Sequence, residues 1–121
     1  MGLDMYAFST EEAIPATDFA RTKDSAEFFS WRKHPNLHGW MERLYRAKGG
    51  NADDFNCVTL LLDPADIDAL EADVLADRLP PTEGFFFGVT RPEEKHLDLE
   101  FIAKAREWFE QGEYVFYDSW W

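Results

Sequence analysis

The sequence contains a single cysteine, Cys57, among 121 residues. One thiol cannot form an internal disulfide, and its position in the apolar run 57–62 predicts an inert buried side chain. The chain also lacks the roughly 18 to 20 consecutive apolar residues of a membrane span, and residues 1–4 lack the basic and apolar parts of a signal peptide. We therefore expect a cytoplasmic protein with no membrane attachment.

Basic residues are scarce, with 12 Lys and Arg against 24 Asp and Glu, which gives a net charge of -12. Such a surface argues against direct binding to nucleic-acid phosphates or anionic lipid. The opposite role, an acidic decoy that mimics nucleic acid, remains an alternative function. It is less favoured because a decoy needs ordered rows of carboxylates, whereas these are scattered among the expected helices.

The usual signatures of a catalytic or metal site are missing. The glycines do not have the spacing of a phosphate-binding loop, and no serine lies in a G-x-S-x-G turn. His34 and His38 are four residues apart, but Pro35 stands where a zinc protease needs glutamate, and three histidines with one cysteine do not complete a ligand set. We expect no metal, no cofactor and no catalytic residues, and the balance is against an enzyme.

The most decisive helix pattern covers residues 35–48. Pro35 suits the first helical position and Gly49-Gly50 supplies a left-handed stop. An apolar stripe of period 3.6 lies between them, and Asp63-Pro64 opens a second helix in the same way. The complete prediction is strands at 3–8, 26–31, 57–62, 84–90 and 114–120, helices at 35–48, 63–78 and about 92–111, and a surface excursion at 11–25.

These elements predict an α+β fold in a single domain that spans residues 1–121. Aromatic residues make up 17% of the chain, so the core should be crowded with rings. The run 57–62 is apolar on both faces and is expected to be a central strand. Because strands and helices alternate after residue 26, we expect one mixed sheet of about four to five strands with three helices packed on it.

The start of the first helix carries the densest group of cations. Arg32, Lys33 and His34 crowd a helix N-terminus whose dipole is already positive, and His38 follows one turn later. Something negative should lie among them. It is either an internal carboxylate, such as Asp4 or the C-terminal group of Trp121, or an external anion held as a ligand. The second alternative describes a small enzyme or an anion-binding protein.

The favoured function is a non-enzymatic accessory protein that acts by protein–protein interaction. Its partner is not specified by the sequence, but aromatic side chains would make the contact. Binding through such a patch should hardly respond to salt, whereas the affinity of an acidic decoy should collapse as salt rises. The aromatic patch candidates are Trp31, Trp40, Phe86, Tyr117 and Trp120.

Four motifs stand in order along the chain: residues 1–6 (MGLDMY), Trp31-Arg32-Lys33 followed by Leu37-His38 and Trp40, Pro81-Thr82 followed by residues 84–88 (GFFFG), and residues 117–120 (YDSW). Together they resemble a family of small uncharacterised phage and prophage proteins. The resemblance covers nearly the whole chain and implies a phage-related accessory protein, without an activity. Some proteins of that kind carry a phosphoglycerate kinase label, which these residues do not support, because that enzyme needs two large domains with a nucleotide site between them.

Overall fold

The computed structural model, which describes residues 2–84 and 86–121, contains one four-stranded sheet and three helices. The strand order is β2-β1-β4-β3, and the architecture is the predicted α+β fold. In chain order the elements are β1 (Asp4–Thr10), β2 (Ala26–Arg32), α1 (Pro35–Ala47), β3 (Leu60–Leu62), α2 (Pro64–Leu75), α3 (Glu94–Glu110) and β4 (Tyr114–Trp120).

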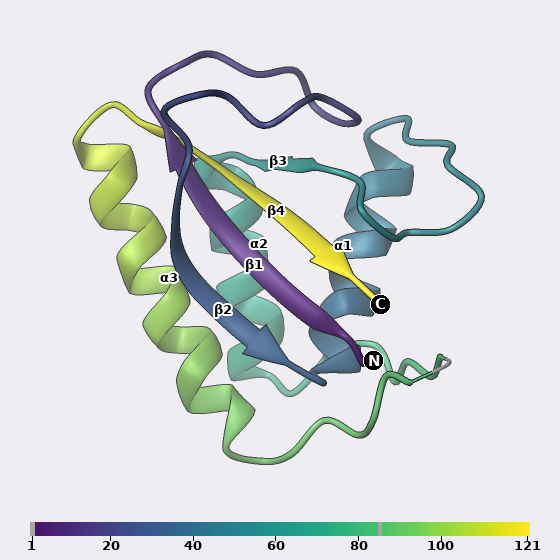
Figure 1. Cartoon of the computed structure of the whole chain (residues 1–121). Helices are drawn as coiled ribbons and strands as arrows, with labels where there is room; N and C mark the ends of the chain where they lie inside the picture. The colour runs from purple at the N-terminus through teal and green to yellow at the C-terminus, as the bar shows by residue number, and fades with distance from the viewer. Residues whose placement is uncertain (1, 85) are drawn as a thin grey trace.

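The first and last strands, β1 and β4, lie side by side in the middle of the sheet (Figure 1). All three strand pairings are antiparallel, so the prediction of a mixed sheet is wrong. The physical reason is the path of the connections. The connection through α1 carries the chain from one edge of the sheet, at β2, to the other edge, at β3, so these two strands are not neighbours. The connection through α2 and α3 then brings the chain back, so that β4 runs antiparallel to β3.

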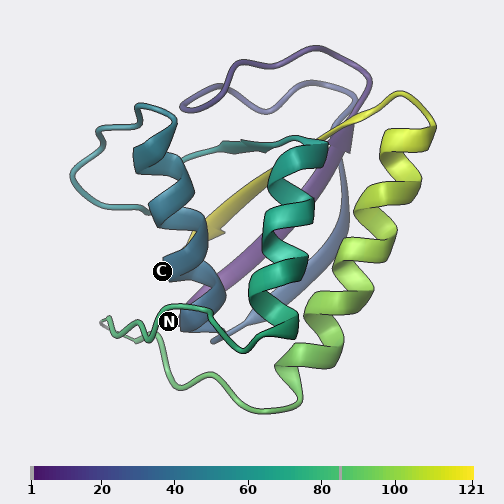
Figure 2. The ribbon, with the colours of Figure 1, turned by 180° about the vertical axis from the view of Figure 1, so that it is seen from behind.

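All three helices cover the same face of the sheet (Figure 2). Strand residues alternate between the two faces, and the helical face receives the apolar set. The core there is continuous, with α1 contributing the predicted stripe, of which Leu44 alone is only partly buried. Fully buried members of this core are Leu3, Met5, Ala7, Leu37, Met41, Val115 and Tyr117.

The ends of α1 follow the local signals. Pro35 occupies the first turn, and Gly49 has φ 97°, the left-handed conformation that ends the helix. Gly39 lies inside the helix because Thr82 packs directly on it: a Cβ at this position would meet the Thr82 hydroxyl oxygen at 1.9 Å. The loop before α3 can therefore approach α1 closely.

The prediction of a central strand at 57–62 is wrong in extent and position. Only Leu60–Leu62 forms a strand, and it lies at the sheet edge. Its outer side is covered by the 11–25 excursion: Leu61 N donates to Ala16 O at 2.9 Å, and Asp18 N donates to Thr59 O at 3.0 Å. A loop, not a further strand, therefore supplies backbone hydrogen bonds along this edge.

The predicted strand at 84–90 is also absent from Gly84 and residues 86–90, and Phe85 lies outside the described residues. Phe86 and Gly88 both have positive φ, 67° and 74°, which an extended strand does not permit. The segment turns so that the ring of Phe87 packs edge-on against Trp121, with centroids 5.1 Å apart. Phe87 therefore joins the core without a sheet, whereas Phe86 is exposed.

We expect Asp63→Ala to lower the free energy of unfolding by about 1 kcal/mol, because it removes the N-cap of α2. The Asp63 carboxylate accepts from Asp66 N, and the Asp66 carboxylate accepts from Asp63 N, both at 2.9 Å. Urea denaturation would measure the loss. Asp53→Ala, at an exposed loop position, is the control and should change stability by less than about 0.5 kcal/mol; equal effects would contradict the capping role.

Candidate functional site

The sheet surface that the helices leave uncovered faces the viewer in Figure 1, and we call it the open face. It is built from alternate residues of three strands whose register aligns them in rows. No single stretch of sequence contains this surface, because β1 and β4 are at opposite ends of the chain. The rows are Arg32, Asp4 and Trp120; Ser30, Tyr6 and Asp118; and Glu27, Phe8 and Phe116.

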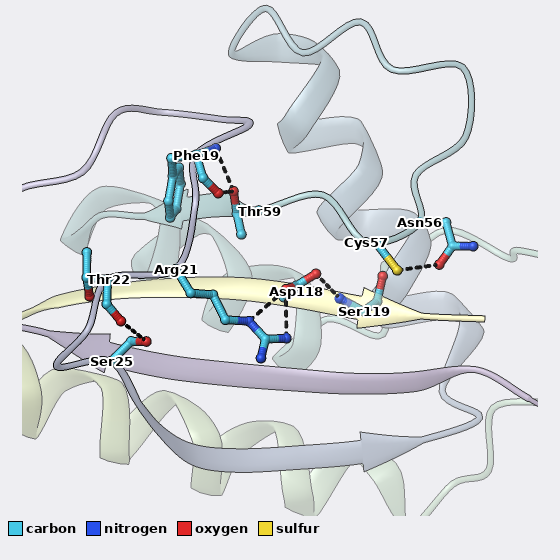
Figure 3. Close-up of polar contacts among 9 residues, drawn as sticks. All are labelled: Phe19, Arg21, Thr22, Ser25, Asn56, Cys57, Thr59, Asp118 and Ser119. Carbon is cyan, nitrogen blue, oxygen red and sulfur yellow. Dashed lines mark hydrogen bonds and ion pairs between the residues drawn. The ribbon is translucent and has the colours of Figure 1, made fainter.

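The segment between β1 and β2 covers one end of the open face (Figure 3). Phe19 places its ring edge-on against Phe116, with centroids 5.2 Å apart, and Phe116 stacks on Phe8 at 5.0 Å. The Cζ atom of Arg21 lies 4.3 Å from the centroid of the Phe8 ring, while its Nε and Nη2 donate to Asp118 Oδ2 at 3.1 and 2.9 Å. A guanidinium group thus lies between an aromatic ring and a carboxylate.

Side-chain hydrogen bonds fix this segment at both ends. The Thr59 hydroxyl accepts from Phe19 N at 2.8 Å and donates to Phe19 O at 2.7 Å (Figure 3). Nearer β2, the carboxylate of Asp24 accepts from the hydroxyls of Thr10 and Thr22 at 2.6 and 2.8 Å. The bond from Thr10 is the main cause that lowers the pKa of Asp24 to about 2.

A pocket of about 430 Å³ opens beside Arg21 on the open face. Tyr6, Asp118 and Trp120 are among its lining residues, together with Glu27 and Cys57. Trp120 exposes 66% of its surface. An exposed tryptophan next to a polar concavity is typical of binding surfaces, where one large ring contributes much of the contact area.

The electrostatic environment of this pocket is negative. Burial raises the pKa of Tyr6, and the nearby carboxylates of Asp4 and Glu27 raise it further. Burial, followed by the charge of Asp118, likewise raises the pKa of Cys57. A thiol with a raised pKa is a poor nucleophile, so the pocket favours binding of a cation over covalent chemistry.

Cys57 is exposed, so the prediction of a buried thiol is wrong. Its backbone has φ 58°, and its N–H donates to Ser119 O at 2.8 Å. Because β3 begins only at Leu60, this bond holds the segment before β3 against β4 and does not lengthen the β3–β4 pairing. The left-handed turn at Cys57 keeps the side chain at the surface (Figure 3).

The predicted cationic cluster does not converge on one site. Arg32 Nη1 donates to Asp4 Oδ1 at 2.9 Å on the open face, so an internal carboxylate accompanies it. Lys33 has φ 56°, and its stem would contact a Cβ placed at Gly88 at 3.0 Å; no ion pair of Lys33 is found within the described part of the chain. The two histidines of the cluster point into the interior.

His34 is fully buried and belongs to a hydrogen-bonded network with Asp98 of α3. Its Nε2 lies 2.8 Å from Asp98 Oδ2, and Trp31 Nε1 donates to Asp98 Oδ1 at 3.2 Å. Its Nδ1 lies 3.0 Å from the hydroxyl of Thr90, which also accepts from Asn36 N in the first turn of α1. Thr90, rather than the side chain of His34, therefore caps this helix.

This network borders a pocket of about 410 Å³ that Glu94 and Arg91 also line. Burial raises the pKa of the Glu94 carboxyl. However, the two partners of His34 also bond other groups of the fold: the Thr90 hydroxyl accepts from Asn36 N, and Asp98 Oδ1 accepts from Trp31 Nε1. The arrangement supports a structural function for His34 over the enzyme alternative.

His38 is surrounded by rings. Its Nδ1 lies 2.6 Å from the hydroxyl of Tyr117, and Phe55 and Phe87 have ring centroids 4.8 and 5.2 Å away. Its Nε2 has no hydrogen-bond partner in residues 2–84 and 86–121. Burial lowers the pKa of His38 to about 4, so the ring is neutral at physiological pH and contributes to the core.

The five aromatic patch candidates separate into core and surface. Trp31, Trp40 and Tyr117 have exposed fractions of 5%, 9% and 0%, so they cannot contact a partner in this structure. Phe86 and Trp120 are exposed. Sequence reasoning missed Tyr6, which is half-buried, and the covered open-face rings Phe8 and Phe116, although Asp4, Tyr6 and Phe8 visibly alternate with the apolar residues Met5 and Ala7. That alternation is the signal of a second, uncovered sheet face.

Within the described ranges, no group of three or more His, Cys, Asp and Glu side chains is arranged to hold a metal ion. None of the helices described is long and apolar enough to cross a bilayer. A scan against protein-family models and searches of curated proteins and of solved structures find no match for this chain. Function is therefore inferred from the open face and its pocket.

We expect Asp98→Ala to lower the free energy of unfolding by about 3 to 5 kcal/mol, because it leaves His34 and Trp31 Nε1 buried without their partner. Asp4→Ala should cost less than about 1 kcal/mol, since the Arg32–Asp4 pair is exposed to solvent. Chemical denaturation of both variants would measure the difference. Similar small losses would show that the buried network does not hold the fold together.

We expect stability to fall with acid in a window set by His38. The folded state holds this ring neutral down to about pH 4, whereas the unfolded chain binds a proton near pH 6.5, so stability is lost as pH falls from about 6.5 to about 4 and not further below. The loss from this group is about 3 kcal/mol. Denaturation at several pH values would measure how the free energy of unfolding depends on pH. Compared with the parent protein, this dependence should be shallower for His38→Gln and unchanged for His96→Gln, at an exposed position.

Proposed function

We propose that this protein binds a basic segment of another protein on its open face, with Trp120 as the anchor. The observation that carries the proposal is the exposure of Trp120, 66%, at the rim of the open-face pocket. Its neighbour Tyr6 is half-buried and offers a second ring. Aromatic rings attract the cationic side chains of a partner through their negative faces.

The charge of the protein supports a basic partner. The net charge of -12 attracts a positively charged segment at long range and speeds its association. At short range, the carboxylates around Tyr6 that raise its pKa would favour a cation in the pocket. A partner with both basic and apolar residues fits this combination of rings and carboxylates.

The decoy alternative has less support. Some carboxylates are neutralised by cations of the same chain: Asp118 pairs with Arg21, and Arg106 pairs with both Asp68 and Glu71. A surface that mimics a phosphate backbone needs its charges free and regularly spaced. The negative charge of this chain therefore fits the steering of a partner better than the imitation of nucleic acid.

The cellular setting of this function is part of the same proposal. The resemblance to small phage and prophage proteins suggests an accessory protein that acts on a host or phage partner. The exposed Cys57 has no second cysteine to pair with, which fits a reducing, cytoplasmic compartment. Neither suggestion depends on an enzymatic activity.

We expect a short oligo-arginine peptide to bind the protein and an oligo-glutamine peptide of equal length not to bind. Trp120→Ala should weaken the oligo-arginine complex by about tenfold or more, because it removes the exposed ring that anchors the cation. Isothermal titration calorimetry at low and physiological salt would measure both affinities.

Tyr114→Ala is the matched control, since Tyr114 is an exposed aromatic residue at the other end of the same strand. The affinity of Tyr114→Ala for the oligo-arginine peptide should equal that of the parent protein. The proposed function is wrong if Trp120→Ala and Tyr114→Ala bind the peptide equally well. Binding that disappears entirely at physiological salt would instead favour the decoy alternative.

A further inference from the structure

The open face already holds one cation of its own, Arg21. Both Nε and Nη2 donate to the same oxygen of Asp118 (Figure 3). The flat guanidinium group also lies over the Phe8 ring. A planar guanidinium group can stack on a ring while its edge donates two hydrogen bonds to a carboxylate, whereas a lysine ammonium has neither the plane nor the fork of donors. This part of the open face is therefore complementary to arginine.

Asp118 depends on this cation. Its side chain is only 10% exposed, and its Oδ1 accepts the N–H of Ser119 at 2.8 Å. The other oxygen, Oδ2, is the one that accepts from Arg21. A nearly buried carboxylate that loses its charged partner is strongly unfavourable. Asp118 therefore has to be paired with a cation, whether from this chain or from another.

Arg21 can be exchanged for another cation. Its side chain is 50% exposed, so its ion pair adds little stability as long as an incoming cation keeps Asp118 paired. The backbone of the segment is fixed elsewhere, through Phe19 on Thr59 and through Asp24 on Thr10. The Arg21 side chain can therefore rotate into water while the segment stays in place.

We propose that the partner's anchoring residue is an arginine and that it replaces Arg21 on Asp118 and Phe8. The proposal rests on the function proposed above, since it names the side chain that the basic segment inserts. Arg21 is the internal occupant that keeps Asp118 paired until the partner arrives. Trp120 and Tyr6, on the uncovered side of the same pocket, then hold the residues that flank the inserted arginine.

Chemical rescue tests the chemistry of the site without a peptide. In Arg21→Ala the place of the guanidinium group is empty and Asp118 has lost its cation. Methylguanidinium chloride at non-denaturing millimolar concentration should raise the melting temperature of this variant, whereas methylammonium chloride should not. The parent protein, in which Arg21 fills the site, and the double variant Arg21→Ala/Asp118→Asn, which has no carboxylate, should not respond to methylguanidinium.

Competition tests the exchange itself. Without Arg21, the oligo-arginine peptide should bind roughly two- to fivefold tighter than to the parent protein, which is the gain expected from removing a half-exposed ion pair. An oligo-lysine peptide gains only from the added negative charge, so its improvement should be smaller. Arg21→Gln, which retains part of the stem over Phe8, should show the same order of affinities if Arg21→Ala is poorly folded.

The proposal is overturned if methylguanidinium stabilises neither Arg21→Ala nor Arg21→Gln. It is equally overturned if methylguanidinium stabilises these variants no more than methylammonium does. It is also overturned if oligo-arginine binds the variants no more tightly than it binds the parent protein. These results would leave the proposed function intact as long as Trp120→Ala still weakens peptide binding. Equal binding by the parent protein and Trp120→Ala would remove the proposed function, whatever the rescue experiment shows.

Discussion

The antiparallel pairing of β1 with β4 is the constraint on which the rest of the structure depends. It joins the two ends of the chain in the middle of the sheet, from Asp4 beside Trp120 to Thr10 beside Tyr114. Because side chains alternate along each strand, this one register sends an apolar set toward the helices and an aromatic and charged set toward solvent. A shift by one residue would exchange the two faces, so the core and the open face are determined together.

The second constraint is the buried His34–Asp98 network, which fixes α1 relative to α3 and β2. One carboxylate serves both His34 and Trp31, while Thr90 serves both His34 and the first turn of α1. Buried polar groups are tolerated only when they are bonded, so the two helices and the strand can meet in few other ways. Packing thus explains the burial of His34 before α1, whereas Arg32 and Lys33 remain at the surface, with Arg32 beside Asp4.

The open face combines two requirements that usually conflict. A sheet surface exposed to water must be polar enough to avoid aggregation, and a binding surface must offer apolar area. Here the segment between β1 and β2 covers Phe116 with Phe19 and Phe8 with Arg21, so these two rings of the open face are shielded by the chain itself. Trp120 remains outside that shield, and the contrast between shielded and unshielded rings is what marks the pocket as a binding site.

The sequence by itself determined the elements whose signals are local. Pro35 and Gly49 bound α1, the Asp63 cap begins α2, and the aromatic run 114–120 forms β4, because each depends on residues only a few positions away. The open-face site could be predicted only in part: Asp4, Arg32 and Trp120 were among the candidates, whereas Tyr6, Arg21 and Asp118 were not.

Tertiary structure decided the remainder. Leu60–Leu62 is an edge strand because the distant segment 16–18 covers it. Residues 86–90 lie outside the sheet, where Phe87 packs on Trp121. His34 and His38, spaced like a metal pair, face different partners once α1 is packed. In each case the contacting residues lie far apart in the chain. The conformation of each segment therefore depends on burial and hydrogen bonding in the whole fold, which no local pattern contains.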